Sequence, residues 1–224
     1  MDEKIKGIEV DDVEVDEIWG FVAKKEGHKY DHELNVAEIG DAYCFVAMER
    51  NTKLVLTHYL GKRSPQSTDQ FISRLALVTA HNRYQLTSDG YPPYKPAVKS
   101  YLRGRVDFAQ LVKVYATSRE GEQRYSPGEV VDAVPQKVMG NPDSDRICTS
   151  HIERQNLSIR MGMRRMTRLT NAFSKKWENL EAAYALWFAY YNFCRLHRTL
   201  RTTPAMESGI SGNQWGIADL LREI

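Results

Sequence analysis

Strand-type and helix-type patterns alternate through the first half of the chain, and their order limits the fold to a few architectures. Segments rich in β-branched and aromatic residues predict five strands, at residues 13–22, 42–48, 54–60, 84–88 and 108–116. A turn-like segment joins the second strand to the third and predicts a β-hairpin. Strands that are followed by alternating helices and strands are typical of an α/β domain built on one mixed sheet.

Two helices are predicted among the later strands. Ser64 followed by Pro65 is an N-cap with proline at the first helical position, and apolar residues then recur at helical spacing to about His81. A second helix is predicted at residues 96–103. The order β-β-β-α-β-α-β resembles the ribonuclease H-like fold, whose mixed five-stranded sheet presents acidic residues at strand ends. We expect residues 1–160 to form such a catalytic domain.

The second half of the chain begins with a segment rich in glycine and proline. Residues 117–145 predict a long loop insertion that contains a short extended piece at 129–139. Helix resumes near His151, and a longer helix is predicted at 175–194, where an apolar stripe is more typical of core than of a surface that stacks on bases. Residues 161–224 are therefore expected to form a basic linker and a helical extension packed on the first domain.

Composition places the chain among soluble globular proteins. Of its 224 residues, 42% are hydrophobic, the mean hydropathy is -0.52, and no apolar run approaches the roughly 20 residues that span a bilayer. A cytoplasmic location is expected, because the N-terminus lacks the apolar stretch of a secretory signal. Three widely spaced cysteines argue against a disulfide framework, and His28 and His32 lie in a polar segment that is more typical of a solvated turn than of a metal site.

Charge is distributed unevenly. Residues 1–49 carry 5 basic and 14 acidic side chains, whereas residues 146–201 carry 11 basic and 3 acidic ones. This asymmetry fits a polyanion bound by the basic part, with the carboxylates used elsewhere, for example on metal ions. A pair of solvated faces is the alternative.

Three carboxylates are candidate ligands for a divalent metal ion. Asp16 lies inside a strand pattern, where a buried charge needs compensation that a divalent cation could supply; a solvent-facing strand edge is the alternative. Asp89 follows a short strand and precedes Gly90, so it is either a ligand at the strand end or an ordinary turn residue. Glu153 is either a ligand at a helix start or, with Ser150, half of a capping box.

Three segments of the chain resemble a known family. EVDEIWGFVAKKEG (14–27), LTSDGYPPY (86–94) and TSHIERQNLSIRMGMRRMTRLTNAFSKK (149–176) look like the three catalytic blocks of DDE transposases of the insertion sequence one family. YYNFCRLHRTLRTTPAME (190–207) is similar to a Tyr-Asn, Arg-Pro-His and Thr-Pro element of transposases and integrases, with Leu196 in place of the common proline. The resemblance covers most of residues 13–207.

The resemblance implies a function and a site. It implies DNA strand cleavage and strand transfer in transposition, catalysed by two Mg²⁺ or Mn²⁺ ions on Asp16, Asp89 and Glu153, with the protein acting as a homo-oligomer on transposon ends and target DNA. Basic and polar side chains of the last block and of the C-terminal element are the candidates for DNA contact: Arg154, Asn156, Arg160, Arg164, Arg165, Arg168, Lys175, Lys176, Arg195, His197 and Arg198.

One departure from the family and two alternatives remain. Complete members carry an N-terminal zinc-finger and helix-turn-helix region, whereas this sequence starts almost at the first catalytic strand, so recognition of element ends is expected from a separate or frameshift-fused partner. A stand-alone metal-dependent nuclease or resolvase on the same fold is the first alternative. A non-catalytic DNA-binding remnant of a decayed element is the second.

Overall fold

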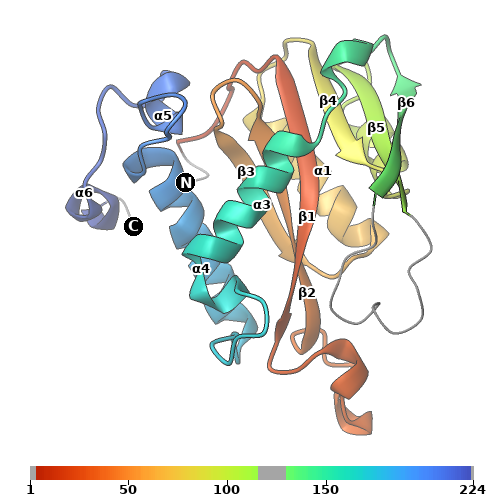
Figure 1. The fold of residues 1–224 in the computed structure, drawn as a ribbon, viewed down its shortest axis with the longest axis vertical. Helices are drawn as coiled ribbons and strands as arrows, with labels where there is room; N and C mark the ends of the chain where they lie inside the picture. Colours follow the sequence, from red (N-terminus) through yellow and green to blue (C-terminus); the bar gives the residue numbers. More distant parts are fainter. Residues whose placement is uncertain (1–3, 116–129, 223–224) are drawn as a thin grey trace.

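A computed structural model describes residues 4–115 and 130–222 and shows a mixed sheet between two layers of helices (Figure 1). The sheet has six strands in the order β3-β2-β1-β4-β5-β6. These strands are β1 (Asp12–Val22), β2 (Gly40–Glu49), β3 (Val55–Gly61), β4 (Tyr84–Asp89), β5 (Val106–Tyr115) and β6 (Val130–Met139). The main helices are α1 (Pro65–Val78), α2 (Tyr94–Tyr101), α3 (Ser150–Gly162) and α4 (Trp177–Ala189).

Strand direction is set by the connections. The hairpin predicted between β2 and β3 is present, and β2 is also antiparallel to β1. Helical crossovers make β1, β4 and β5 parallel to one another, whereas β6 returns antiparallel to β5. Because Val15 lies opposite Ser88, the next residue of each strand brings Asp16 and Asp89 to neighbouring positions.

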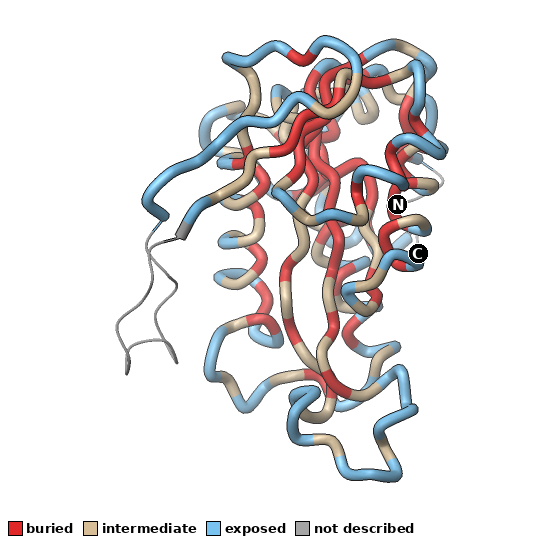
Figure 2. Tube along the Cα trace, turned by 90° about the vertical axis from the view of Figure 1, so that its right-hand side faces the viewer, coloured by how far each residue is buried: buried red, intermediate tan, exposed pale blue. Residues whose placement is uncertain are grey.

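The sixth strand corrects the sequence prediction of a five-stranded sheet with a loop insertion at 117–145. Residues 130–139 form a full edge strand rather than a short extended piece, and only part of the predicted loop falls in the gap at 116–129, outside the described residues. Most of β6 is exposed, as Figure 2 shows. Proline is tolerated in an edge strand, and Pro135 pairs opposite Leu111 there, so its presence did not exclude a strand.

Helices α1 and α2 cover one face of the sheet. The side chain of Ser64 accepts a hydrogen bond from the amide of Ser67, which confirms the predicted start of α1. Phe71, Leu75 and Val78 then pack against the sheet at helical spacing. Alternate residues of β1, including Val13 and Val15, complete this core.

Helices α3 and α4 cover the opposite face (Figure 1). Ile18 and Val22 of β1 pack there with apolar residues of α4, so the apolar stripe forms core, as expected. A Cβ atom on Gly162 would overlap the ring of Trp187, and glycine therefore permits the last turn of α3 to approach α4.

The long helix predicted at 175–194 is shorter than expected. Helix α4 ends at Ala189, and a π-helical turn (Tyr190–Cys194) follows it. Within this turn the buried side chain of Asn192 accepts from the amide of Val55 at 3.0 Å and donates to its carbonyl at 2.9 Å. These two hydrogen bonds join the C-terminal segment to β3. Short helices α5 (Pro204–Glu207) and α6 (Ile217–Arg222) complete the described chain.

Two further expectations concern isolated side chains. Cys44, Cys148 and Cys194 are all free thiols, and His28 and His32 are exposed on two short 3₁₀ turns. Among the described helices, none is long and apolar enough to cross a membrane.

Candidate active site

Two adjacent parallel strands bring Asp16, inside β1, and Asp89, the last residue of β4, together on the face covered by α3. Both side chains project to the same side of the sheet, because side chains alternate along each strand. Asp16 is held by its neighbours: its Oδ1 accepts from the amide of Glu17 at 2.8 Å, and its Oδ2 accepts from Asn156 of α3 at 2.8 Å. Asp89 accepts from the amide of Tyr91 at 3.0 Å.

Glu153 reaches the same site from the first turn of α3. Its carboxylate accepts from the hydroxyl of Thr149 at 2.6 Å and pairs with the ammonium group of Lys113 on β5. The capping box that Ser150 and Glu153 predicted is absent, because the helix starts one residue earlier than that motif requires, with Thr149 as the N-cap residue. Glu153 is therefore free of capping and faces a cavity.

That cavity has a volume of about 430 Å³ and contains all three of the acids that the sequence singled out. Its other lining residues come from β5, from the turn after β4, and from the loop before α1. Arg63 of this loop lies over the ring of Tyr91, 4.1 Å from its centroid, and its guanidinium is 3.8 Å from Asp89. Arg63 thus lies near Asp89, and Lys113 lies next to Glu153.

Glu17 is a fourth acid that the sequence analysis did not select. It follows Asp16 on β1 and points to the opposite face, where its side chain is only 3% exposed and lies 3.4 Å from Arg63. Carboxylate oxygens of Asp16, Glu17 and Asp89 nevertheless all lie within 4.8 Å of one another. The signal in the sequence was the adjacent acidic pair Asp16-Glu17 inside a strand, because neighbouring side chains of a strand face opposite sides of the sheet.

Burial and repulsion from neighbouring carboxylates make Asp16 and Glu17 hard to ionise. Burial, followed by the negative charge of Asp89, raises the pKa of Asp16 to about 7, and Glu153 adds to the effect. Burial and then Asp89 likewise raise the pKa of Glu17 to about 8. A divalent cation would relieve both effects, since hard oxygen ligands of this kind are the ones that Mg²⁺ prefers.

These shifts predict how the stability of the metal-free protein depends on pH. The folded chain holds protons on Asp16 and Glu17 that the unfolded chain releases near pH 4, so the stability from these groups is complete below that pH. It is lost as the pH rises through about 7 and 8. We expect the urea midpoint, measured in EDTA, to fall between pH 5 and pH 8. The Asp16→Asn variant should show a smaller fall, and an equal fall in both proteins would contradict the assigned pKa of Asp16.

A buried glutamate fixes the position of α3. Glu14 is two residues before Asp16 on the same face of β1, and its side chain is 1% exposed. One carboxylate oxygen accepts from the amides of His151 and Ile152 at 3.0 and 2.9 Å, and the other lies 2.7 Å from Nδ1 of His151. Glu14 therefore caps α3 from a distant strand and sets the approach of Glu153 to Asp16. The sequence analysis did not select Glu14 as a site residue.

The residues predicted to contact DNA fall into two groups. Exposed side chains available to a ligand are Arg154, Arg164, Arg168, Lys175, Lys176, Arg195 and Arg198. The others have structural contacts. Arg160 donates to the carbonyls of Trp19 and Met166, both at 3.0 Å, because it lies where α3 crosses β1. Arg165 donates to Ser174, and Asn156 binds Asp16.

His197 belongs to the second group as well. It is half-buried, and its ring lies edge-on to Tyr191, with Nδ1 2.9 Å from the hydroxyl of Thr199. Burial, and after it the charges of Lys53 and Arg195, lower the pKa of His197. A neutral, packed imidazole is a poor partner for phosphate.

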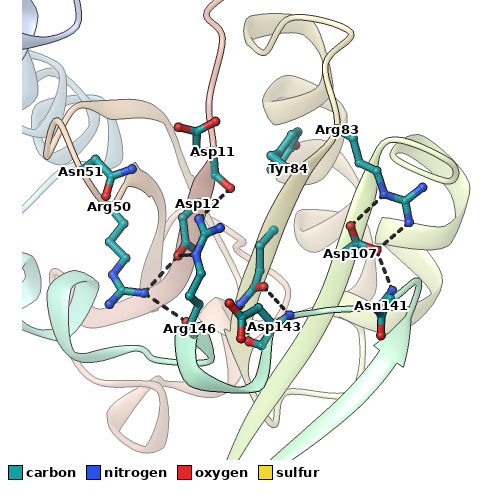
Figure 3. A pocket seen from close by; sticks show the side chains of 11 residues that line it. Asp11, Asp12, Arg50, Asn51, Arg83, Tyr84, Asp107, Asn141, Asp143 and Arg146 are labelled. Atoms are coloured by element: carbon teal, nitrogen blue, oxygen red, sulfur yellow. Dashed lines mark hydrogen bonds and ion pairs between the residues drawn. The ribbon is translucent and has the colours of Figure 1, made fainter.

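A second polar cavity, of about 640 Å³, lies at the start of β1 (Figure 3). Its centre is the buried Asp12, which accepts from Arg50 at 3.0 Å and from Arg146 at 3.1 Å. Burial raises the pKa of Asp12 in spite of these two arginines. The ion pairs join β1 to the β2–β3 turn and to the segment that leads into α3. They therefore help to hold the start of α3, which carries Glu153, against the sheet.

Comparisons with known proteins add little to this geometry. No family model matches the chain, and no curated protein matches it. A solved structure described as "Cryo-EM structure of piggyBac transposase synaptic complex with hairpin DNA" is similar over 95% of this chain, with 10% sequence identity and a TM-score of 0.42. The matched region covers 51% of the transposase chain, so this protein spans about half the length of that transposase. At this level the likeness carries no argument about function, which rests on the site itself.

Proposed function

We propose that the protein is a DDE transposase of the insertion sequence one type, which cleaves DNA strands and transfers them to target DNA with the help of divalent metal ions. One observation carries the proposal: Asp16, Asp89 and Glu153, from two strands and a helix far apart in sequence, line one cavity. Acids are costly to gather in this way unless a cation compensates them. The order β3-β2-β1-β4-β5, in which only β2 is antiparallel to its neighbours, supports a ribonuclease H-like fold with β6 added at the edge.

The donor set fits two Mg²⁺ or Mn²⁺ ions. Asp16 lies near both of the other acids and would be shared, while Asp89 and Glu153 would each complete one ion's ligands. When bound, the ions activate the attacking oxygen and neutralise charge on the leaving oxygen. Asn156 orients the carboxylate of Asp16, and Thr149 orients that of Glu153.

The reaction needs no covalent enzyme intermediate. Water attacks a phosphodiester at an element end, the P–O bond to the 3′ oxygen breaks, and a 3′ hydroxyl is released. That hydroxyl then attacks a phosphodiester of the target and loses its proton to solvent as the new P–O bond forms. The P–O bond to the target's own 3′ oxygen breaks, and this oxygen takes a proton from solvent and leaves as a 3′ hydroxyl. Arg63 and Lys113 lie close enough to the acids to contact the negatively charged phosphate during either step.

The remaining parts of the proposal concern organisation. Residues 1–160 would form the catalytic domain and residues 161–224 the basic, helical extension; the apolar cluster shared by β1 and α4 supports the packing of this extension on the sheet. Action as a homo-oligomer on DNA in the cytoplasm belongs to the same proposal.

A strand-transfer assay tests the proposal. Purified protein and Mg²⁺ would be incubated with a labelled duplex that has a recessed 3′ hydroxyl and with a supercoiled plasmid. Joining of the label to the plasmid supports a transposase, whereas cleavage without joining supports the alternative of a metal-dependent nuclease or resolvase. Neither product with Mg²⁺ or Mn²⁺ would support the alternative of a non-catalytic DNA-binding remnant.

We predict that exposed arginines after α3 contribute phosphate contacts. Both arginines lie beyond the end of α3 at Gly162: Arg164 begins a short 3₁₀ turn, and Arg168 follows that turn. The double variant Arg164→Gln and Arg168→Gln should reduce the slope of log affinity against log salt by about 2, since each phosphate contact contributes about 0.9. The loss should be equal for unrelated DNA sequences, because phosphates carry no base information.

The matched control changes two exposed arginines on the other helical layer, Arg74→Gln and Arg103→Gln. It should leave the slope unchanged. Binding would be measured by fluorescence anisotropy over a range of salt concentrations. An unchanged slope in the Arg164 and Arg168 variant would show that these two arginines do not contact DNA phosphates. Arg160 is left unchanged in this test because its hydrogen bonds to two backbone carbonyls support the fold.

A further inference from the structure

A second set of possible metal ligands lies at the start of α3, separate from the cavity that Asp16, Asp89 and Glu153 line. The carboxylate of Glu14, the sulfur of Cys148 and a ring nitrogen of His151 all lie within 4.8 Å of one another. The set combines one sulfur, one nitrogen and one oxygen ligand. We propose that Glu14, Cys148 and His151 bind a Zn²⁺-class transition-metal ion.

The chemistry of the ligands selects the metal. Thiolate and imidazole ligands favour Zn²⁺ and similar ions, whereas Mg²⁺ prefers oxygen ligands alone. Zn²⁺ accepts sulfur at about 2.3 Å and nitrogen or oxygen at about 2.0 to 2.2 Å, so donor atoms of a tetrahedral site lie about 3 to 4 Å apart. Atoms already within 4.8 Å of one another need only small side-chain movements to reach that geometry. Cys148 and His151 are also three residues apart, a short spacing common among zinc ligands.

Each ligand has an atom free for the ion. Glu14 uses one oxygen for the amides at the start of α3, and only its other oxygen faces Nδ1 of His151 at 2.7 Å. An ion between these two atoms would replace a single hydrogen bond and leave the helix cap intact. The imidazole side chain is 30% exposed, so its other nitrogen reaches solvent when Nδ1 binds the ion.

The surroundings of Cys148 favour its use as a ligand. The amide of Ser150 donates to its sulfur at 3.3 Å, and the hydroxyl of Ser150 lies 2.9 Å from it. The amide of Ser150 can keep donating to the sulfur when it binds the ion as a thiolate, and the thiol proton would pass to solvent on binding. The charge of Lys53 already interacts with both Glu14 and Cys148, so the metal-free protein places a cation beside these ligands. A bound ion would join β1 to α3, the two elements that carry Asp16 and Glu153.

Cobalt provides a direct test. The full chain would be titrated with Co²⁺ in excess Mg²⁺, which occupies oxygen-only sites, and thiolate-to-cobalt charge-transfer absorption would be recorded. We expect the band in the wild type, its loss in Cys148→Ser, and its retention in the control Cys194→Ser, whose thiol is buried in the C-terminal segment. His151→Gln should weaken Co²⁺ binding by at least about tenfold.

Zinc provides the second readout. Zn²⁺ should displace Co²⁺ and raise the thermal unfolding temperature of the wild type but not that of Cys148→Ser. Circular dichroism of each variant checks that it is folded. Absence of the band in the wild type, its survival in Cys148→Ser, or unchanged Co²⁺ affinity in His151→Gln would each overturn the site. Neither measurement depends on transposase activity, so each proposal can be refuted without the other.

Discussion

Replacing any one of the three cavity acids is expected to reduce Mg²⁺-dependent cleavage and joining by at least about a thousandfold, or roughly 4 kcal/mol of transition-state stabilisation. The variants are Asp16→Asn, Asp89→Asn and Glu153→Gln. Each keeps the size of the side chain but removes the charge that would hold a metal ion. Turnover would be measured in single-turnover assays with labelled duplex DNA.

The same substitutions should not lower the thermal stability of the metal-free protein. In metal-free buffer the Asp16→Asn and Asp89→Asn variants should unfold at the same temperature as the wild type or slightly higher, because repulsion among the clustered acids is relieved. Asp145→Asn, an exposed acid on the segment before α3, is the matched control and should change neither property. Normal turnover in Glu153→Gln would show that Glu153 is not the third ligand.

Removing the carboxylate of Glu14 should have the largest effect on stability. Glu14→Ala is expected to lower the free energy of unfolding by about 3 kcal/mol or more, because two amides at the start of α3 and the ring of His151 lose their buried acceptor. Glu14→Gln should lose less, since its carbonyl oxygen can still accept from an amide. Urea unfolding followed by circular dichroism gives both values.

The control for this prediction is an exposed glutamate in the first turn of another helix. Glu178→Ala on α4 removes an equivalent side chain whose nearest cation, Lys176, is 3.8 Å away at the surface, so the change should stay within about 0.5 kcal/mol. A loss of less than about 1 kcal/mol in Glu14→Ala would mean that water replaces the carboxylate and that Glu14 does not hold α3 in place.

Local patterns predicted most of the secondary structure. The five predicted strands and the start of α1 are present, because alternating or β-branched segments and a Ser-Pro helix start act within a few residues. Longer-range features were predicted less well. The extended piece predicted at 129–139 was assigned to a loop rather than to the sheet, because an exposed edge strand lacks the apolar pattern of a central one. The helix predicted to Cys194 was too long because tertiary hydrogen bonds of Asn192 favour a π-helical turn.

The candidate site shows the same contrast between what local sequence patterns predict and what long-range contacts decide. The sequence by itself determined which acids lie in a strand, follow a strand or start a helix, and so which residues to consider. Only the tertiary structure decided that Asp16, Asp89 and Glu153 line one cavity, because the pairing of β1 with β4 and the placement of α3 join segments more than 60 residues apart. It also separated acids that look alike in the sequence: Asp12 pairs with arginines, Glu14 caps a helix, and Asp16 faces the cavity. Their different roles follow from burial and from partners that no local pattern specifies.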